Sequence, residues 1–413
     1  MFKSYDVIII GSGAAGLIAS VKAAQNGKKI LLIEKLSSLG AKLKATGGGR
    51  CNLSNTLQLQ EFMKSFGKNG RFMSKALQIL DHKQLMDFFK SIEVDTHIPD
   101  GFRIFPTSHN SQTILDGFKK KLEKLNVDIL LNCRAEDIIT IDKKIKALKT
   151  SKGVFESKNI ILATGGLGYP KLGATGDGFE MVKKLGHNIT DLYPAMMPLN
   201  TKQEWQKNCT ADTIAKATIK VNIEDKKVKK LKATGDLIFT KKGLRGPVIL
   251  DFAREITPYL DQYKEVPILI NMTKSMSEND IINFIKEQNN KNPNFTLLEN
   301  LNKLLPKSVL IELFKLNNID EKISFKNLKG STKDTLIKTL AWTPFTIIGH
   351  DGFSKAMITR GGIDLKEIDP NSMKSKIIDG LYFAGEIVDL DGPCGGYNLQ
   401  WSFSSGYLAA CLY

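Results

Sequence analysis

The stretch "VIIIGSGAAGLIASVKAAQNGKKILLIEK" (residues 7–35) places a glycine turn between an apolar run and a helical pattern. The apolar run, residues 5–10, predicts a parallel strand that is buried on both faces. The turn has the spacing G-x-G-x-x-G. Gly11 permits the tight turn, Gly13 lets the backbone approach a diphosphate, and Gly16 lets the new helix pack on the strand. This order of elements predicts a Rossmann-like α/β domain that binds a dinucleotide.

The helix after the turn is expected to end near Gln25, and residues 28–33 predict the next strand. Glu34 follows that strand at about 20 residues from the turn, where a carboxylate accepts hydrogen bonds from ribose hydroxyls. The free N–H groups at the helix N-terminus bind the diphosphate. The cofactor-binding residues expected here are Gly11, Ser12, Gly13, Ala14, Ala15, Gly16, Glu34 and Lys35.

The segment that follows, residues 34–55, is glycine-rich and basic, which favours FAD over NAD. NAD-dependent dehydrogenases usually continue there with a short loop and a helix, whereas a flavoprotein lays an extended segment along FAD. Lys42 and Arg50 can offset phosphate or flavin charge, although a solvated surface lysine explains Lys42 equally well. We expect cofactor contacts from Lys42, Thr46, Gly47, Gly48, Gly49, Arg50, Cys51 and Asn52.

At "GGGRCNLSN" (47–55) the chain resembles the BaiN-like family of bacterial flavoproteins, also called aminoacetone oxidase family FAD-binding enzymes. The resemblance covers nearly the whole chain and includes residues 162–187, 240–250, 359–364 and 380–410. It implies an FAD-dependent oxidase or reductase that acts on a small molecule. One departure is Cys394, where we expect a threonine. If a hydroxyl there bonds the cofactor or a nearby loop, the thiol weakens that contact.

Further cofactor contacts are expected from strands that end on small residues and from a helix that starts near Tyr397. Residues 159–166 and 380–389 predict such strands, and residues 127–138 predict a strand that leads to a turn near Ala135, beside the adenine. The N-terminus of the last helix would face the flavin edge that becomes anionic on reduction. The residues concerned are Ala135, Ala163, Thr164, Gly165, Gly385, Glu386, Asp389, Gly396, Tyr397, Asn398 and Leu399.

These motifs bracket the chain, so we expect a discontinuous FAD-binding domain, residues 1–192 and 345–413, of the two-dinucleotide-binding-domain flavoprotein type. The intervening residues 193–344 form an inserted cap that shapes the substrate pocket. The insertion is expected to be a β-barrel followed by a helical subdomain. Its strand-like stretches are 213–240 and 266–272, and its helical ones are 278–288, 296–316 and 332–342.

The catalytic groups are less evident, because no Ser-His-Asp arrangement or carboxylate pair stands out. Arg103, Arg245, Arg360 and Tyr397 are candidates to line the open face of the flavin, and the catalytic candidates are Arg50, Arg103, Arg245 and Tyr397. Each arginine can bind a substrate carboxylate or make a structural ion pair. A second G-x-G-x-x-G is missing, so NAD(P)H, if used, binds only transiently over the flavin. An oxidase would need only O2, and the sequence leaves oxidase and reductase open.

The net charge of +16 raises a nucleic-acid hypothesis. However, only 7 of the 59 basic residues are arginines, and the lysines are spread along the chain. This pattern favours a solvated basic surface and argues against a nucleic-acid partner. A flavoprotein that binds or modifies tRNA remains the alternative.

The five cysteines form no C-x-x-C pair and no zinc pattern with histidine, which indicates a reducing compartment and no metal site. No signal peptide and no membrane-length apolar run is visible. We therefore expect a cytoplasmic protein, whose oligomeric state the sequence does not determine.

Overall fold

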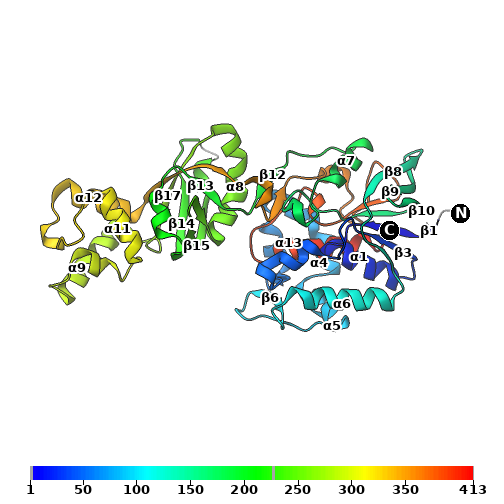
Figure 1. The fold of residues 1–413 in the computed structure, drawn as a ribbon, viewed down its shortest axis with the longest axis horizontal. Coiled ribbons are helices and arrows are strands. Elements are labelled where there is room, and N and C mark those ends of the chain that lie inside the picture. Colours follow the sequence, from blue (N-terminus) through cyan, green and yellow to red (C-terminus); the bar gives the residue numbers. More distant parts are fainter. Residues whose placement is uncertain (1–2, 226–227, 413) are drawn as a thin grey trace. The chain divides into compact units, whose positions relative to one another are not determined.

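The computed structural model describes residues 3–225 and 228–412, and the chain divides into two compact units (Figure 1). The first unit comprises the residues up to Pro194 and those from Met357 onward, and the second comprises Ala195–Ala356. The expected return to the first unit at residue 345 is too early. The reason is that β18 (Thr343–His350) is a strand of the second unit's barrel.

The first unit is built on a parallel sheet whose strand order places β2 in the middle. The order is β20 (Leu381–Phe383), β11 (Ile160–Leu162), β2 (Val7–Ile10), β3 (Ile30–Ile33) and β7 (Asp128–Leu130). Every residue of β2 and β3 is buried. Helix α1 spans Ala14–Gln25, so the predicted helix and its end are confirmed.

The strand predicted over residues 127–138 is wrong, because the structure divides it between two sheets. β7 ends at Leu130, and β8 (Ala135–Ile141) starts in a second sheet. Asn132 adopts a φ of 51°, in the left-handed region, and this turns the chain between the two strands. The turn therefore lies before Ala135 and not at it.

The two ends of the chain meet where α13 (Tyr397–Ala409) packs on α1. A Cβ added at Gly406 would lie 2.3 Å from the carbonyl oxygen of Ala15. A Cβ added at Gly385 would lie 3.1 Å from the Cβ of Ala15. Small residues thus bring the C-terminal segment against the first turn of α1, as α1 and α13 in Figure 1 illustrate.

Smaller sheets and helices complete the first unit. A four-stranded sheet has the order β1 (Ser4–Tyr5), β10 (Gly153–Ser157), β9 (Lys144–Thr150), β8, and a three-stranded sheet the order β4 (Ser54–Asn55), β6 (Arg103–Pro106), β5 (Thr96–His97). Strands β12 (Tyr193–Ala195) and β19 (Ile358–Arg360) pair with each other. The helices are α2 (Ala41–Ala45), α3 (Leu59–Lys64), α4 (Ser74–Ile79), α5 (His82–Ser91), α6 (Ser111–Lys124) and α7 (Asp177–Lys184).

The second unit contains a closed six-stranded barrel and helices, which confirms the predicted barrel with helical regions. The barrel order is β13 (Leu199–Thr201), β16 (Gly243–Arg245), β15 (Lys232–Phe239), β14 (Thr213–Val221), β17 (Val266–Asn271), β18. The helices are α8 (Pro247–Tyr263), α9 (Glu278–Lys291), α10 (Leu297–Leu301), α11 (Lys307–Leu316) and α12 (Gly330–Ala341). Helix α8 was not predicted; it starts at a proline directly after Gly246, which has a φ of 104°.

Over residues 3–225 and 228–412, no helix combines the length and the apolar character that crossing a membrane would require.

Candidate cofactor site

The three glycines of the first turn have three different surroundings. A Cβ at Gly11 would lie 2.6 Å from the carbonyl oxygen of Ala163, and one at Gly16 would lie 1.8 Å from the carbonyl oxygen of Gly11. A Cβ at Gly13 would meet nothing within 4 Å. Gly11 and Gly16 are therefore required by close backbone packing, whereas Gly13 borders open space in front of the α1 N-terminus. This is the arrangement that a bound diphosphate needs.

Glu34 follows β3 and holds the same turn in place. Its Oε2 accepts hydrogen bonds from the backbone N–H (3.0 Å) and the hydroxyl (2.6 Å) of Ser12, and its Oε1 accepts one from the N–H of Leu36 (2.9 Å). A carboxylate offers about four acceptor positions, so one remains for a ribose hydroxyl. Cys133 donates its N–H to the Glu34 carbonyl (2.9 Å), which places the turn before β8 beside this carboxylate.

Lys35 belongs to a charged cluster that was not predicted from the sequence. Its ammonium contacts Asp177 at 3.1 Å and also the Thr175 hydroxyl. The Arg134 guanidinium bonds the same carboxylate at 3.2 Å. Burial raises the pKa of Asp177, but hydrogen bonds from Thr175 and Lys35 outweigh it and lower the pKa below its usual value. The sequence carries one sign of this cluster. In "TGDG" (residues 175–178) a glycine, which is left-handed in the structure, precedes an acidic residue at the start of α7.

Lys42 and Glu386 join the two ends of the site. Their ion pair measures 2.8 Å between Nζ and Oε2, and both side chains are largely shielded from solvent. The Oε1 of Glu386 accepts the N–H of Thr359 at 2.9 Å. In the protein alone, each of these two charges thus neutralises the other, so a phosphate that approaches Lys42 has to compete with Glu386.

The glycine run between α2 and Arg50 exposes its backbone. Gly47, Gly48 and Gly49 all have left-handed φ angles, and a Cβ at Gly48 or Gly49 would meet nothing within 4 Å. The thiol of Cys51 is fully buried, and burial raises its pKa to about 12. A contact of Cys51 with a cofactor stays a prediction.

Thr164, directly after β11, supplies an unpaired polar group. Its hydroxyl oxygen is buried and has no hydrogen-bond partner, and neighbouring Gly165 borders open space. A buried hydroxyl without a partner costs about 1–3 kcal/mol unless a ligand satisfies it. Together with the open side of Gly13, this group fits an extended dinucleotide held along the strand ends.

The loop before α13 is tied to β4. A Cβ at Gly396 would lie 2.4 Å from the Ser54 backbone, and Asn55 donates its side-chain N–H to the Gly395 carbonyl at 2.9 Å. Asn398 closes the loop by accepting the N–H of Gly392 at 2.8 Å. Asn52, with its amide oriented to satisfy its neighbours, accepts the N–H of Gly396 at 3.1 Å.

Of the four candidate catalytic residues, the structure brings only two arginines together. Arg50 and Arg103 are brought together over the ring of Phe105. Tyr397 is only 8% exposed, and its ring packs against Phe62 at 5.0 Å. Arg245 lies in the barrel of the second unit, on β16. The catalytic roles of all four stay predictions.

The remaining expected residues occupy buried or half-buried positions. Ala163 and Ala135 are 6% and 8% exposed, and Leu399 packs against the main core. Asp389 is half-buried, and burial raises its pKa despite a hydrogen bond with Thr190. A direct cofactor contact by each of these residues stays a prediction.

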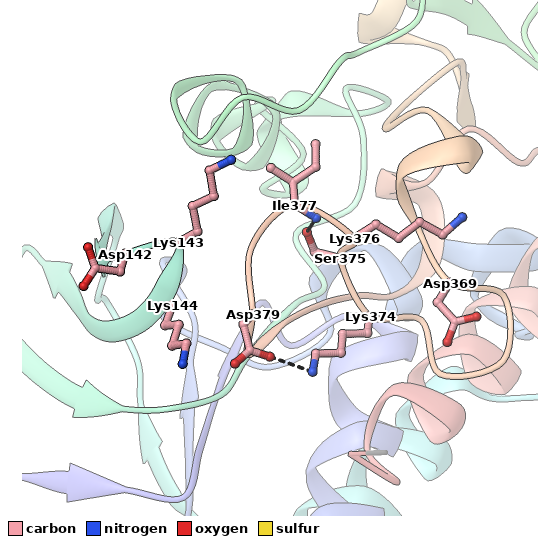
Figure 2. Close-up of a pocket in the computed structure, with 9 residues that line it drawn as sticks. All are labelled: Asp142, Lys143, Lys144, Asp369, Lys374, Ser375, Lys376, Ile377 and Asp379. Carbon is pink, nitrogen blue, oxygen red and sulfur yellow. Dashed lines mark hydrogen bonds and ion pairs between the residues drawn. The ribbon is translucent and has the colours of Figure 1, made fainter.

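A cavity of about 460 Å³ lies elsewhere in the first unit, at the β8–β9 turn and the loop before β20 (Figure 2). Figure 2 shows that its charged side chains extend in different directions, and the ammonium of Lys374 is paired with Asp379 at 2.7 Å. None of its lining residues was predicted to bind a cofactor. They are Asp142, Lys143, Lys144, Asp369, Lys374, Ser375, Lys376, Ile377 and Asp379.

Hydrogen bonds of His187 anchor the loop before β20, whose residue Ser375 lines this cavity. Its Nε2 lies 2.9 Å from the Ser375 hydroxyl, and its Nδ1 lies 3.0 Å from Glu367. Ser375 also accepts the N–H groups of Ile377 and Ile378. Both lone pairs of that oxygen are occupied, so Ser375 holds the loop and is not a free nucleophile.

The comparisons with known proteins agree with this geometry. The family model described as the HI0933-like protein Rossmann domain matches residues 5–412. The chain is 29% identical over 408 residues to the 3-dehydro-bile acid delta(4,6)-reductase of Clostridium scindens, covering 97% of each chain. It is also 29% identical to the ribosomal RNA dihydrouridine synthase of Escherichia coli, covering 99% of this chain and 98% of the relative. An open flavocytochrome c3 fumarate reductase shares the fold, with a TM-score of 0.52 and 18% identity, covering 99% of this chain and 78% of that one.

Proposed function

Because the chain belongs to the HI0933-like family of FAD-binding Rossmann proteins and is therefore an FAD-dependent oxidoreductase, we propose that it reduces a carbon–carbon double bond conjugated to a carbonyl group in a small molecule. NAD(P)H is the proposed electron donor. The observation that carries the proposal is the glycine turn, in which only Gly13 borders open space at the start of α1.

The two full-length relatives support this choice of reaction. A 3-dehydro-bile acid carries a ketone, and the reductase relative saturates double bonds conjugated with it. Dihydrouridine is uridine whose ring double bond, conjugated with a carbonyl, has been reduced. The two substrates differ greatly in size, but the bond that is reduced belongs to the same chemical class.

The residues of this chain divide the work of holding the cofactor. The N–H groups at the start of α1 would bind the diphosphate, and the free acceptor position of Glu34 would bind a ribose hydroxyl. The open backbone at Gly48 and Gly49 and the hydroxyl of Thr164 would satisfy other polar groups. When bound, FAD would supply the two-electron chemistry, taking up a hydride from NAD(P)H and giving one to the substrate, while solvent would supply the proton that completes the saturated bond.

The test is an anaerobic titration of the purified yellow protein. We expect NADPH or NADH to bleach the flavin absorbance, and a conjugated enone to restore it before air is admitted. Reoxidation by O2 at the same rate with and without the enone would favour an oxidase and contradict this proposal. Gly13→Val protein, which should hold no FAD, serves as the control.

A second candidate is reduction of a uracil base within RNA. The net charge of +16 and the dihydrouridine synthase relative favour it. RNA binding that weakens steeply between 50 and 200 mM salt, with reoxidation of the bleached protein by RNA, would support it. Absence of RNA binding at about 150 mM salt would remove it.

A further inference from the structure

Two of the seven arginines lie over the ring of Phe105, which belongs to β6, the middle strand of the small sheet formed by β4, β6 and β5. The guanidinium carbons of Arg50 and Arg103 lie 5.7 and 5.9 Å from the centroid of the Phe105 ring. Phe105 is only 4% exposed, whereas both arginines are exposed. Guanidinium planes are attracted to aromatic faces, so Phe105 fixes where the two charges lie.

Each arginine is also anchored through its Nε atom. The Nε of Arg50 donates to the carbonyl of Gly47 at 3.3 Å, and the Nε of Arg103 contacts Asp100 at 2.5 Å. Within residues 3–225 and 228–412, the structure shows no hydrogen-bond acceptor for the terminal nitrogens of either side chain. The two forks are therefore oriented but still have donors to offer.

The charge of this pair is positive. The N–H of Arg103, together with its guanidinium, lowers the pKa of Asp100 to about 2, so Asp100 stays ionised and balances Arg103. Within the described part of the chain, Arg50 has no acidic partner. The neighbouring rings of His97 and His109, whose centroids are 4.5 Å apart, add no negative charge.

The pair also lies next to the cofactor segment. Arg50 directly follows the exposed glycine run and bonds back to Gly47. Asn55 on β4 pairs with Arg103 on β6 and donates to Gly395, in the loop before α13. Arg50 is thus bonded to the glycine run, and the strand partner of Arg103 is bonded to the loop before α13; both segments are ones that the sequence assigns to FAD.

We propose that Arg50 and Arg103 together form a binding site for one oxyanion, a carboxylate or phosphate carried by the small-molecule substrate or by the pyridine nucleotide. The identity of the ligand rests on the proposed function. Two guanidinium forks match the planar, divided charge of such a group. An RNA backbone would instead need a longer track of cations.

The first experiment titrates the holoenzyme with inorganic phosphate, and separately with acetate, by calorimetry at constant ionic strength. Arg50→Gln and Arg103→Gln should each weaken binding by about tenfold or more, since each removes charge-assisted hydrogen bonds. Arg50→Lys keeps the charge but loses the planar guanidinium group, so it should bind the anion more weakly than the unaltered protein and more tightly than Arg50→Gln. Arg71→Gln, at an exposed arginine of the same unit, should bind as the unaltered protein does. Equal affinities in all variants, or no binding of either anion, would overturn the proposal.

The second experiment identifies the source of the anion. If the pair holds a nucleotide phosphate, Arg50→Gln raises the NADPH concentration for half-maximal bleaching by about tenfold. If it holds a substrate group, bleaching is unchanged and more enone is needed for half-maximal reoxidation. Either result supports the site, whereas no change in both overturns it. Failure of the proposed function would give a different result: the protein would lack FAD, or NAD(P)H would not bleach it. In either case the two arginines would still bind phosphate.

Discussion

Substitution of Gly13 separates cofactor binding from folding more sharply than any other change in the turn. Its φ of −70° is ordinary for any residue, and an added Cβ meets nothing within 4 Å. Gly13 is the N-cap of α1 without a side-chain cap bond, so a Val there should cost the apo protein at most about 1 kcal/mol. Gly13→Val should therefore fold.

The same change should abolish FAD binding. Its side chain occupies the space in front of the N–H groups of Ala14 and Ala15, which have no partner within the helix. Loss of two charge-assisted hydrogen bonds, at about 1.5–3 kcal/mol each, amounts to about 3–6 kcal/mol. At about 1.4 kcal/mol per factor of ten, affinity for FAD should fall by about 10² to 10⁴.

The assay compares bound FAD per chain, from absorbance, with the unfolding midpoint of the apo protein. Gly349→Val is a matched control, because a Cβ at Gly349 also meets nothing within 4 Å and its φ is not left-handed. Gly349 lies on β18, and this variant should keep its FAD. Gly16→Ala should fail to fold, since its Cβ would lie 1.8 Å from a carbonyl oxygen. If Gly13→Val retained one FAD per chain with nearly unchanged affinity, the turn would not hold the diphosphate.

Three further predictions follow from the charges and thiols. Burial raises the pKa of Cys51 to about 12, so iodoacetamide at pH 8 should label half-buried Cys394 well before Cys51. Peptide mass spectrometry can follow both labels, and labelling of Cys51 first would contradict its burial. Burial lowers the pKa of His187 from 6.5, so the unfolded state binds more protons and the free energy of unfolding should fall as the pH drops below about 6.5. In His187→Gln the thermal midpoint should fall less steeply with pH, and the same pH dependence as in the unaltered protein would refute this. Lys42→Met should destabilise the apo protein by about 1–3 kcal/mol in urea unfolding, because the Glu386 carboxylate loses its partner. The double variant with Glu386→Gln should recover part of that lost stability.

The elements that the sequence predicted well are those in which local chemistry and tertiary packing agree. The strand, the glycine turn and helix α1 follow from period and backbone freedom alone, and α1 ends at Gln25 as expected. The last helix likewise starts at Tyr397, after two glycines with left-handed φ angles. In both cases a glycine before the helix permits a close backbone contact, of Gly11 with Ala163 and of Gly396 with Ser54.

The errors occurred where a distant partner decides the outcome. Residues 127–138 are apolar enough for one strand, but Cys133 bonds the backbone of Glu34, and the chain turns there into another sheet. β18 was assigned to the wrong domain because no local pattern shows which sheet a strand joins. The contact of the Tyr397 ring with Phe62, which lies on a separate helix, likewise has no signal in the local sequence.

The pairing of Arg50 with Arg103 shows the same limit from the functional side. Each arginine was singled out alone, because the sequence carries no sign that both would lie over the ring of Phe105. β4 and β6 pair as Ser54 with Ile104, and this register places Arg103 opposite Asn55. The site therefore arises from register, and a shift of one residue would turn Arg103 and Phe105 to the opposite face. A function assigned to either arginine alone is thus incomplete, since the geometry that orients each one depends on the ring that they share.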